Sequence, residues 1–302
     1  MMKCFSLALL VSLSLIKDSA AAEGDWCYEI QGHQTLGCGP RFWGEHYPTC
    51  AKNHQSPINV LTKKAVFDKA LKPFHFKGYN ITGRHLNITN NGHSAQVDLP
   101  TGIEISGGGL SETYIAAQFH FHWGSDEFYG SEHTVDGEKY PMELHIVHKR
   151  KTSTGGFGDL AVLGFFYEET AKNNTEYNSL IESLGHISTK DGYKNFSATL
   201  DKLIPINELK VYYRYNGSLT TPPCNETVIW TLFNTTIKLS KLQLQAFHNS
   251  LNFTEKQRMV ENFRPVQKRS DRIVYTSSSQ VILSSFQSLL ICFIVSFLTI
   301  MS

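Results

Sequence analysis

The amino-acid sequence predicts one mainly β domain with short peripheral helices, an α+β arrangement dominated by sheet. Short runs rich in aromatic and β-branched residues recur between turn signals along the chain. Helical periodicity is clear only in segments 174–184 and 240–249. No internal repeat and no Pro- or Ser-rich linker divides the sequence, so a single domain is the simplest account. The runs predicted as strands are, in chain order, 85–89, 95–99, 115–123, 142–148, 160–167, 210–215 and 227–233.

The composition fits a folded domain and argues against nucleic-acid binding. Hydrophobic residues make up 41% of the 302 residues and charged residues 18%, a balance that can bury a substantial core. The 28 basic and 27 acidic residues nearly cancel, whereas a nucleic-acid-binding domain normally carries a basic face that neutralises phosphates. We therefore expect no nucleic-acid partner.

The N-terminal segment has the order of a secretory signal peptide. Lys3 precedes an apolar run over 5–16 and then the small residues 20–22. We expect a signal peptide over 1–22 and a mature domain over 23–277. A buried N-terminal helix is the alternative, although a run this short cannot span a bilayer either.

The C-terminal segment is typical of a signal for a glycosylphosphatidylinositol (GPI) anchor. Serines at 277–279 precede a spacer and an apolar tail over 289–300, with no charge after Arg272. We expect a removed segment over 278–302 and attachment at Ser277. An ordinary transmembrane helix is the alternative, but it usually needs about 20 apolar residues and a basic stop after them.

Cysteine usage indicates an oxidising compartment. The mature domain keeps four cysteines, and an even number in a secreted domain implies two disulfides. Three pairings are possible; the short separation favours Cys27–Cys38, which leaves Cys50–Cys224 as the long bridge. A four-cysteine zinc cluster is the alternative, but the sequence lacks the paired C-x-x-C spacing of such clusters.

Asn-x-Ser/Thr sequons are dense for one domain and predict N-glycosylation. A sequon needs an exposed loop, so we expect several to carry glycan. Asn216 and Asn225 flank the segment that we assign to the active site, and we expect either to be skipped if its side chain is buried. The other candidates are Asn80, Asn87, Asn173, Asn195, Asn234 and Asn252.

Two histidine-containing segments form the most informative pattern. QFHFHWG over 118–124 places His120 and His122 two residues apart, and ELHIVH over 143–148 contains His145. On a strand, residues i and i+2 share a face, so His120 and His122 point the same way while the aromatic residues between them point to the other. If the second segment lies alongside, His145 completes three nitrogen ligands and leaves a fourth position open, as catalytic zinc sites require.

Neighbouring side chains favour a metal site over packed, hydrogen-bonded histidines. Gln118 and Glu143 each precede a proposed ligand by two residues, and metal-bound histidines usually donate their second N–H to such a group. The spacing matches neither a zinc finger nor H-E-x-x-H, since no two ligands lie at helical separation.

Eight ordered motifs resemble the α-class carbonic anhydrases and cover the chain from Trp26 to about Val274. They are QSPINV (55–60), NNGH (90–93), QFHFHWG (118–124), SEHTVDG (131–137), ELHIVH (143–148), LAVLGFF (160–166), GSLTTPP (217–223) and VIWTLF (228–233). The extracellular features look most like the glycolipid-anchored vertebrate members, isozymes four and fifteen. The resemblance implies a single domain on a large central, mostly antiparallel, twisted sheet.

The resemblance also implies a Zn2+ site and its surroundings. The zinc ligands would be His120, His122 and His145. Their hydrogen-bond partners would be Gln118 and Glu143, with His133 a structural partner of Glu143. In that family the zinc-bound hydroxide donates to a threonine, here Thr220, which donates to a glutamate, here Glu132. This pair orients the nucleophile toward carbon dioxide.

Substrate contacts and a proton path follow from the same resemblance. The residues that match the apolar wall and the substrate contacts are Val147, Val162, Leu219, Thr220, Thr221, Val228 and Trp230. His93, in the NNGH motif, matches the family's proton-shuttle histidine. A histidine suits this role because an imidazole with a pKa near 6.5 both accepts and releases a proton at physiological pH. Tyr28 and Asn91 match groups that order the water chain. Gln96 stands where the best-studied members have Asn, and we expect a slight change in shuttle efficiency.

The expected function is reversible hydration of carbon dioxide by a zinc enzyme, GPI-anchored at the extracellular face of the plasma membrane. Expected partners are carbon dioxide and bicarbonate, sulfonamide and anion inhibitors, the membrane through its lipid, and bicarbonate or proton transporters. One alternative is a catalytically weak, anhydrase-like binding or adhesion module, which the intact ligand set argues against. A zinc esterase or peptidase is the other, and the apolar, narrow pocket wall disfavours it.

Overall fold

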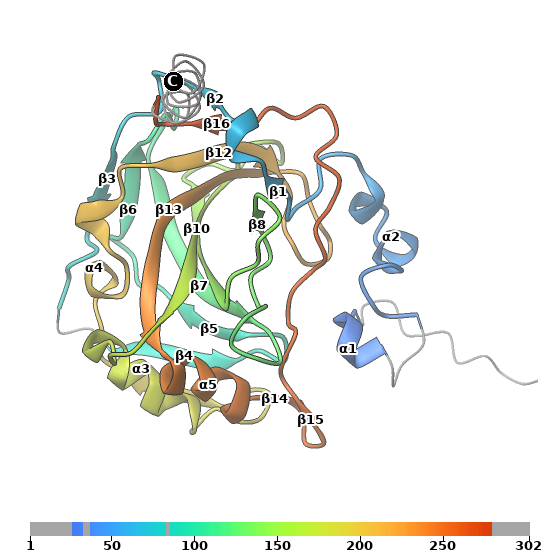
Figure 1. Cartoon of the computed structure of the whole chain (residues 1–302), viewed down its shortest axis with the longest axis vertical. Coiled ribbons are helices and arrows are strands. Elements are labelled where there is room, and N and C mark those ends of the chain that lie inside the picture. The colour runs from blue at the N-terminus through green and yellow to red at the C-terminus, as the bar shows by residue number, and fades with distance from the viewer. Residues whose placement is uncertain (1–25, 33–36, 83–84, 280–302) are drawn as a thin grey trace, which may run out of the picture.

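The computed structural model describes residues 26–32, 37–82 and 85–279, and a 12-stranded twisted β-sheet runs through them (Figure 1). In spatial order its main path is β11 (Tyr193–Phe196), β4 (Leu86–Asn90), β5 (Ala95–Asp98), β7 (Tyr114–Trp123), β9 (Met142–Arg150), β10 (Leu160–Thr170), β13 (Val228–Ser240), β12 (Tyr212–Gly217), β16 (Tyr275–Thr276) and β2 (Val66–Phe67). Off this path, β6 (Glu104–Gly107) pairs with β7 and with β3 (Phe74–Lys77). The predicted mainly β fold is confirmed.

Strand pairing in this sheet is mostly antiparallel, as predicted. Within the described part of this sheet, only β10 with β13 and β16 with β2 run parallel. A parallel pair needs a long connection. The chain between β10 and β13 supplies it, because this stretch contains helices and two further strands, β11 and β12. Two small sheets complete the strands: β1 (Asn59–Val60) with β8 (Thr134–Val135), and β14 (Asn252–Thr254) with β15 (Gln257–Arg258).

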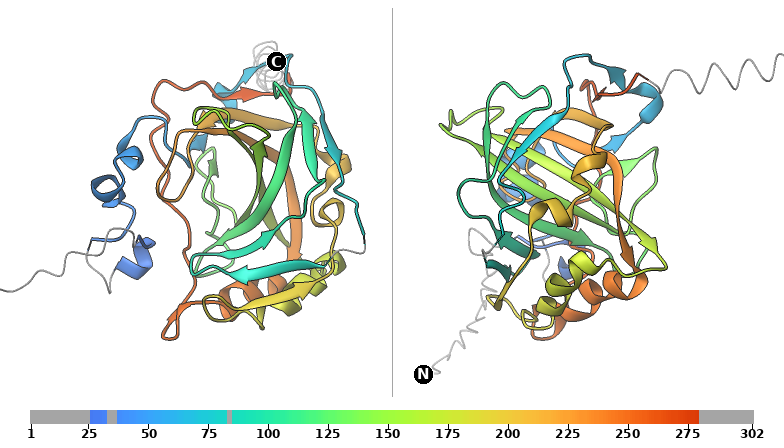
Figure 2. Two further views of the ribbon diagram at one scale, coloured as in Figure 1. Left: turned by 180° about the vertical axis from the view of Figure 1, so that it is seen from behind. Right: turned by 90° about the vertical axis from the view of Figure 1, so that its left-hand side faces the viewer.

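Helices are short and peripheral. Two of them, α3 (Asn178–Leu184) and α5 (Lys241–Ser250), lie together at the end of the sheet that is remote from β2 and β16 (Figures 1 and 2). Ser240 caps α5, since its hydroxyl accepts from the N–H of Gln243 and the Gln243 side chain accepts from the N–H of Ser240. The remaining helices are α1 (Glu29–Gly32), α2 (Trp43–His46), α4 (Leu200–Leu203) and the 3₁₀ turns η1 (Pro48–Ala51), η2 (Thr62–Lys64), η3 (Thr175–Tyr177) and η4 (Ile206–Glu208).

Element boundaries differ from prediction where polar residues continue a strand or a helix begins as a turn. The strand predicted over 227–233 extends to Ser240 as β13, past a polar stretch, through a register shift against β10. The helix predicted over 174–184 starts as the 3₁₀ turn η3, where the Asn174 side chain accepts from the N–H of Glu176. Three of the four β11 residues are exposed, so this edge strand lacks the apolar run that predicts a strand.

The sheet buries a hydrophobic cluster on each face. The larger cluster includes Phe119 and Phe121 of β7, on the side away from the histidines. The smaller cluster covers the histidine face. Its buried members include Val147, Val162, Tyr215, Val228 and Trp230, and Leu219 packs against it. The residues that match the apolar wall are therefore gathered on the face that carries the three histidines.

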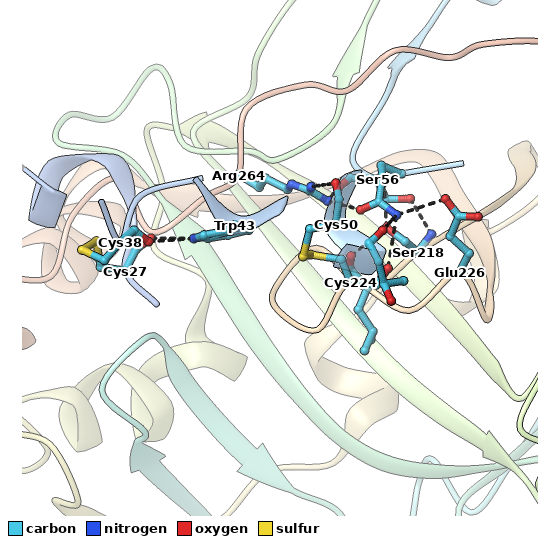
Figure 3. The surroundings of a disulfide bond; sticks show 12 residues. Cys27, Cys38, Trp43, Cys50, Ser56, Ser218, Cys224, Glu226 and Arg264 are labelled. Atoms are coloured by element: carbon cyan, nitrogen blue, oxygen red, sulfur yellow. Dashed lines mark hydrogen bonds between the residues drawn. A yellow bond between two sulfur atoms is a disulfide. The ribbon is translucent and has the colours of Figure 1, made fainter. Parts of the chain in front are cut away.

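Two disulfides join the N-terminal segment to itself and to the β12–β13 loop (Figure 3). Cys27 pairs with Cys38 and Cys50 pairs with Cys224, so the predicted connectivity is confirmed. The Trp43 indole N–H donates to the carbonyls of Cys27 and Cys38 and holds the short loop against α2.

The predicted signal peptide over 1–22 and the apolar tail over 289–300 lie outside the described residues. Within the described ranges, no helix has the length and apolar character to cross a membrane. Asn216 and Asn225 are both exposed, so burial gives no reason for either sequon to be skipped. The other six sequon asparagines are exposed, or half-buried in the case of Asn252.

Candidate active site

Neighbouring strands β7 and β9 bring the three histidines together. Their antiparallel register sets His120 opposite His145 and His122 opposite Glu143. Because alternate residues share a face, all three imidazoles lie on the same side of the sheet. His122 Nε2 lies 3.1 Å from His145 Nδ1, and one nitrogen from each ring lies within 4.8 Å of the others.

Each imidazole is oriented by an acceptor on its other nitrogen. His120 Nδ1 lies 2.8 Å from Gln118 Oε1, and His145 Nε2 lies 2.7 Å from Glu143 Oε1. His122 Nδ1 lies 2.7 Å from the backbone carbonyl of Asn262. These contacts fix the tautomers that leave Nε2 of His120, Nε2 of His122 and Nδ1 of His145 as lone-pair donors facing one another.

The charge state of the rings suits a metal cation. Burial lowers the pKa of His120 well below its ordinary value, and the neighbouring imidazoles lower it further. Burial also lowers the pKa of His122, although the Glu132 carboxylate partly opposes this. Neutral imidazole is the form that ligates metals. Three converging imidazole nitrogens with a carboxylate nearby therefore fit Zn2+ and its open fourth position.

Glu143 is the hub behind His145. Its Oε1 lies 2.7 Å from both His145 Nε2 and His133 Nδ1. Its Oε2 accepts the backbone N–H groups of Glu132 and His133 at 2.9 and 2.8 Å. Burial alone would raise the pKa of Glu143, but the two imidazoles and their hydrogen bonds hold it well below its ordinary value. Glu143 is therefore a buried carboxylate with four donors.

A hydrogen-bonded chain continues from His133 to the loop that contains Thr220. His133 Nε2 and the Tyr215 hydroxyl are 2.6 Å apart, and that hydroxyl donates to Ser56 Oγ at 2.8 Å. Ser56 and Ser218 exchange two bonds, since each backbone N–H donates to the other residue's hydroxyl oxygen. Figure 3 shows Ser56 and Ser218 beside the Cys50–Cys224 disulfide. The start of the Thr220 loop is thus connected to the hydrogen-bond partners of the proposed metal ligands.

Glu132 places a free acceptor beside the proposed metal position. The Arg264 backbone N–H donates to its Oε1 at 2.8 Å. Its Oε2 is buried, lies 3.4 Å from His122 Nε2, and has no hydrogen-bond partner among the described atoms. An orphaned buried acceptor is costly, so this oxygen is suited to a donor supplied in the working site. Thr220 is buried in the adjoining loop.

The wall residues surround the site on its apolar side. The Trp230 ring lies 4.8 Å from the ring of His145, and its indole N–H donates to the Ser218 carbonyl. Leu219 and Thr221 are half-buried at the edge of this wall. Val147, Val162 and Val228 are buried within it.

His93 lies half-buried between aromatic rings rather than in an open loop. Its imidazole stacks on Trp26 with ring centroids 3.9 Å apart, and the Tyr28 ring meets it edge-on at 6.3 Å. The Asn91 side chain closes the turn, since its Oδ1 accepts from the N–H of His93 and its Nδ2 donates to Gln96 Oε1. Burial, with the charge of Glu132 adding to it, raises the pKa of Tyr28 well above its ordinary value.

Sequence reasoning missed two residues that hold the site. Trp26 contacts His93 through the face of its ring, and residue type does not mark such a stacking contact. Asn262 contacts His122 through its backbone, and a carbonyl contact leaves no trace in residue type. Its side chain accepts from the N–H of Trp123 and donates to the carbonyls of Phe121 and His93, all within 3.1 Å. Asn262 thus links the ligand strand to the His93 turn.

Comparison with known proteins agrees with this geometry. The family model described as eukaryotic-type carbonic anhydrase matches residues 38–278. Carbonic anhydrase 4 of Oryctolagus cuniculus is 41% identical over 283 residues, which cover 90% of this chain and 91% of the relative. Carbonic anhydrase 4 of Rattus norvegicus is 36% identical over 97% of this chain and 99% of the relative. Carbonic anhydrase 12 of Homo sapiens is 39% identical over 80% of this chain and 72% of the relative. This chain therefore belongs to the eukaryotic-type carbonic anhydrases, zinc-dependent enzymes that hydrate carbon dioxide.

Proposed function

We propose that this enzyme interconverts carbon dioxide and bicarbonate at the extracellular face of the plasma membrane, with Zn2+ held by His120, His122 and His145. The observation that carries the proposal is the set of three converging imidazole nitrogens beside the buried oxygen of Glu132, which has no hydrogen-bond partner among the described atoms. When bound there, zinc supplies a Lewis acid that makes water a nucleophile at neutral pH. The surrounding side chains orient the reactants, exclude bulk water and remove the proton.

Thr220 and Glu132 would orient the attacking oxygen. Glu132 Oε1 is already engaged by the N–H of Arg264, which leaves Oε2 to accept the proton of the Thr220 hydroxyl. The threonine oxygen would then accept a hydrogen bond from the attacking oxygen. This bond would direct a lone pair of the attacking oxygen toward the substrate. A carboxylate in this position acts as a selector, because only a group that can donate a hydrogen bond satisfies the threonine oxygen.

The apolar wall would bind carbon dioxide without a polar contact. Val147, Val162 and Trp230 are buried on the histidine face and present hydrocarbon and aromatic surface. Carbon dioxide has no hydrogen-bond donor, and a dry apolar surface strengthens the electrostatic interactions of the adjacent site. Leu219 and Thr221, half-buried at the edge, suit contacts to the more polar bicarbonate product.

His93 would carry the proton between the site and solvent. Its stacking on Trp26 holds the ring at the border of the site. The raised pKa of Tyr28 keeps this phenol protonated, so it donates a hydrogen bond to water rather than acting as a base. The Asn91–Gln96 bond offers further polar groups beside the same turn.

The cell-surface location rests on the two terminal sequence patterns, the disulfides and the exposed sequons. Disulfides persist in secreted and extracellular proteins. Ser277 is tied to the sheet, since its N–H donates to the Tyr212 carbonyl and its hydroxyl accepts from the N–H of Tyr212. We therefore propose a signal peptide over 1–22, a mature domain over 23–277 and a lipid attached at Ser277, close to β12. Bicarbonate or proton transporters remain the proposed partners.

Replacing a ligand histidine tests the function directly. His120→Ala should lose both zinc and carbon dioxide hydration, because two imidazoles do not hold the cation in a closed site. His75→Ala, an exposed histidine on β3, is the matched control and should keep both. Metal content by atomic emission and hydration by stopped flow are measured on the same samples. A wild-type protein that holds one zinc per chain yet shows no sulfonamide-sensitive hydration would favour the binding or adhesion module instead.

A further inference from the structure

Two sequon asparagines lie directly opposite each other at one edge of the main sheet. Asn87 of β4 pairs with Asn195 of β11 in antiparallel register, and β11 is the last strand on this side. The adjacent pair, Leu86 with Phe196, is buried in the larger hydrophobic cluster. Because neighbouring positions on a strand point to opposite faces, both asparagines project from the other face, and both are exposed.

That other face is the face of the metal site. The register continues from Asn87 to Asp98 of β5, and from Asp98 to Gln118 of β7. Paired residues on neighbouring antiparallel strands share a face. Gln118 accepts from the proposed metal ligand His120, so the row that starts at Asn195 ends beside that histidine. With strands about 4.8 Å apart, Asn87 lies about 10 Å and Asn195 about 14 Å from Gln118 across the sheet.

Exposure along this row falls toward the metal. Asn195, Asn87 and Asp98 are exposed, whereas Gln118 and His120 are half-buried. His122 and His145, one step further in, are each 1% exposed. The row therefore runs from an open rim into the closed part of the site, and the two sequons stand on the rim.

A glycan at this rim would lie beside the site, on the same face of the sheet. N-linked glycans are bulky and hydrated. Tyr193, two residues before Asn195 on the same face and 68% exposed, adds an aromatic surface against which a sugar can lie. We propose that an N-glycan carried at Asn87 or Asn195 borders the entrance of the active site and excludes large ligands while admitting carbon dioxide, bicarbonate and small sulfonamides. This inference rests on the proposed secretory route.

The experiment compares a small and a large version of one inhibitor. Wild-type protein and the Asn87→Gln/Asn195→Gln double variant, both secreted from cultured cells, are inhibited with free benzenesulfonamide or with the same sulfonamide coupled to a dextran of protein size. The double variant should bind the dextran-coupled inhibitor at least about tenfold more tightly, through faster association. Free benzenesulfonamide and the hydration rate should be unchanged, because neither substitution touches the metal site.

A matched control removes a glycan elsewhere. Asn234 lies on β13, where the hydroxyl of its neighbour Thr235 donates to the Glu208 carbonyl of η4. Asn234→Gln should behave like the wild type with both inhibitors. Glycosidase treatment of the wild type should reproduce the gain seen in the double variant, which excludes an effect of the substitutions themselves.

Mass spectrometry of the sequon peptides separates the ways in which the inference can fail. Glycan at Asn234 or Asn173 with bare asparagines at 87 and 195 would overturn this inference and leave the secretory route standing. An absence of glycan at every sequon would overturn both this inference and the proposed secretory route. Occupied rim sites with no selective gain for the large inhibitor, or an equal gain in Asn234→Gln, would overturn the screening role.

Discussion

Glu143→Gln removes one charge from the hub of the site without changing its shape. The wild-type carboxylate receives four donors, two on each oxygen: His145 and His133 on Oε1, and two backbone N–H groups on Oε2. In glutamine one of these oxygens becomes an NH2 group, so two buried donors lose their acceptor whichever way the amide turns. Each unsatisfied donor costs about 1–3 kcal/mol, which gives about 2–6 kcal/mol in total.

The same substitution should weaken zinc binding. Loss of a carboxylate partner behind a ligating histidine typically lowers metal affinity about 10–100-fold. Urea unfolding of the metal-free protein measures the stability term, and competition with a chelator measures zinc affinity. Glu138→Gln, an exposed carboxylate in the β8 turn, serves as the control and should change neither. If Glu143→Gln stayed within about 0.5 kcal/mol of the wild type and kept its zinc affinity, the hub assignment would be wrong.

Three further predictions concern the proton path, acid stability and anchoring. His93→Ala should slow turnover in weak buffer, and added imidazole should restore it; a rate insensitive to buffer would indicate another proton route. Burial lowers the pKa of His148 from 6.5 to about 4, so its contribution to stability is complete above pH 6.5 and falls as pH drops toward 4, by about 3 kcal/mol in total. Urea unfolding between pH 7 and 4 measures this loss, and a pH-independent midpoint would contradict it. Phosphatidylinositol-specific phospholipase C should release the enzyme from intact cells, whereas persistent attachment would favour a membrane-spanning tail.

The sequence predicted the ligand strands because their pattern is local. On β7, His120 and His122 alternate with buried aromatic residues, and this two-residue period is the period of a strand. The same applies to Gln118 and Glu143, each two residues from its histidine, which is why these partners were accessible without coordinates.

Contacts from distant segments were not accessible from the sequence. Asn262 reaches His122 across 140 residues and through its backbone carbonyl, a group that every residue carries. The stacking of Trp26 on His93 likewise joins segments whose sequences show no mutual pattern. Strand β11 was missed because an exposed edge strand has no apolar face to reveal it, yet its register determines where Asn195 lies.

The proposed metal ligands and Glu132, the residue proposed to help orient the nucleophile, are connected through shared hydrogen bonds. Glu143 binds His145 through one oxygen, and through the other it holds the backbone of Glu132, whose free oxygen faces the site. A change at Glu143 therefore acts on zinc affinity and on Glu132 at once. Residues that share a partner in this way give non-additive effects when they are replaced together. The loss of hydration activity in the double variant Glu143→Gln/Glu132→Gln should consequently be smaller than the sum of the losses in the two single variants, when each loss is expressed as a free energy.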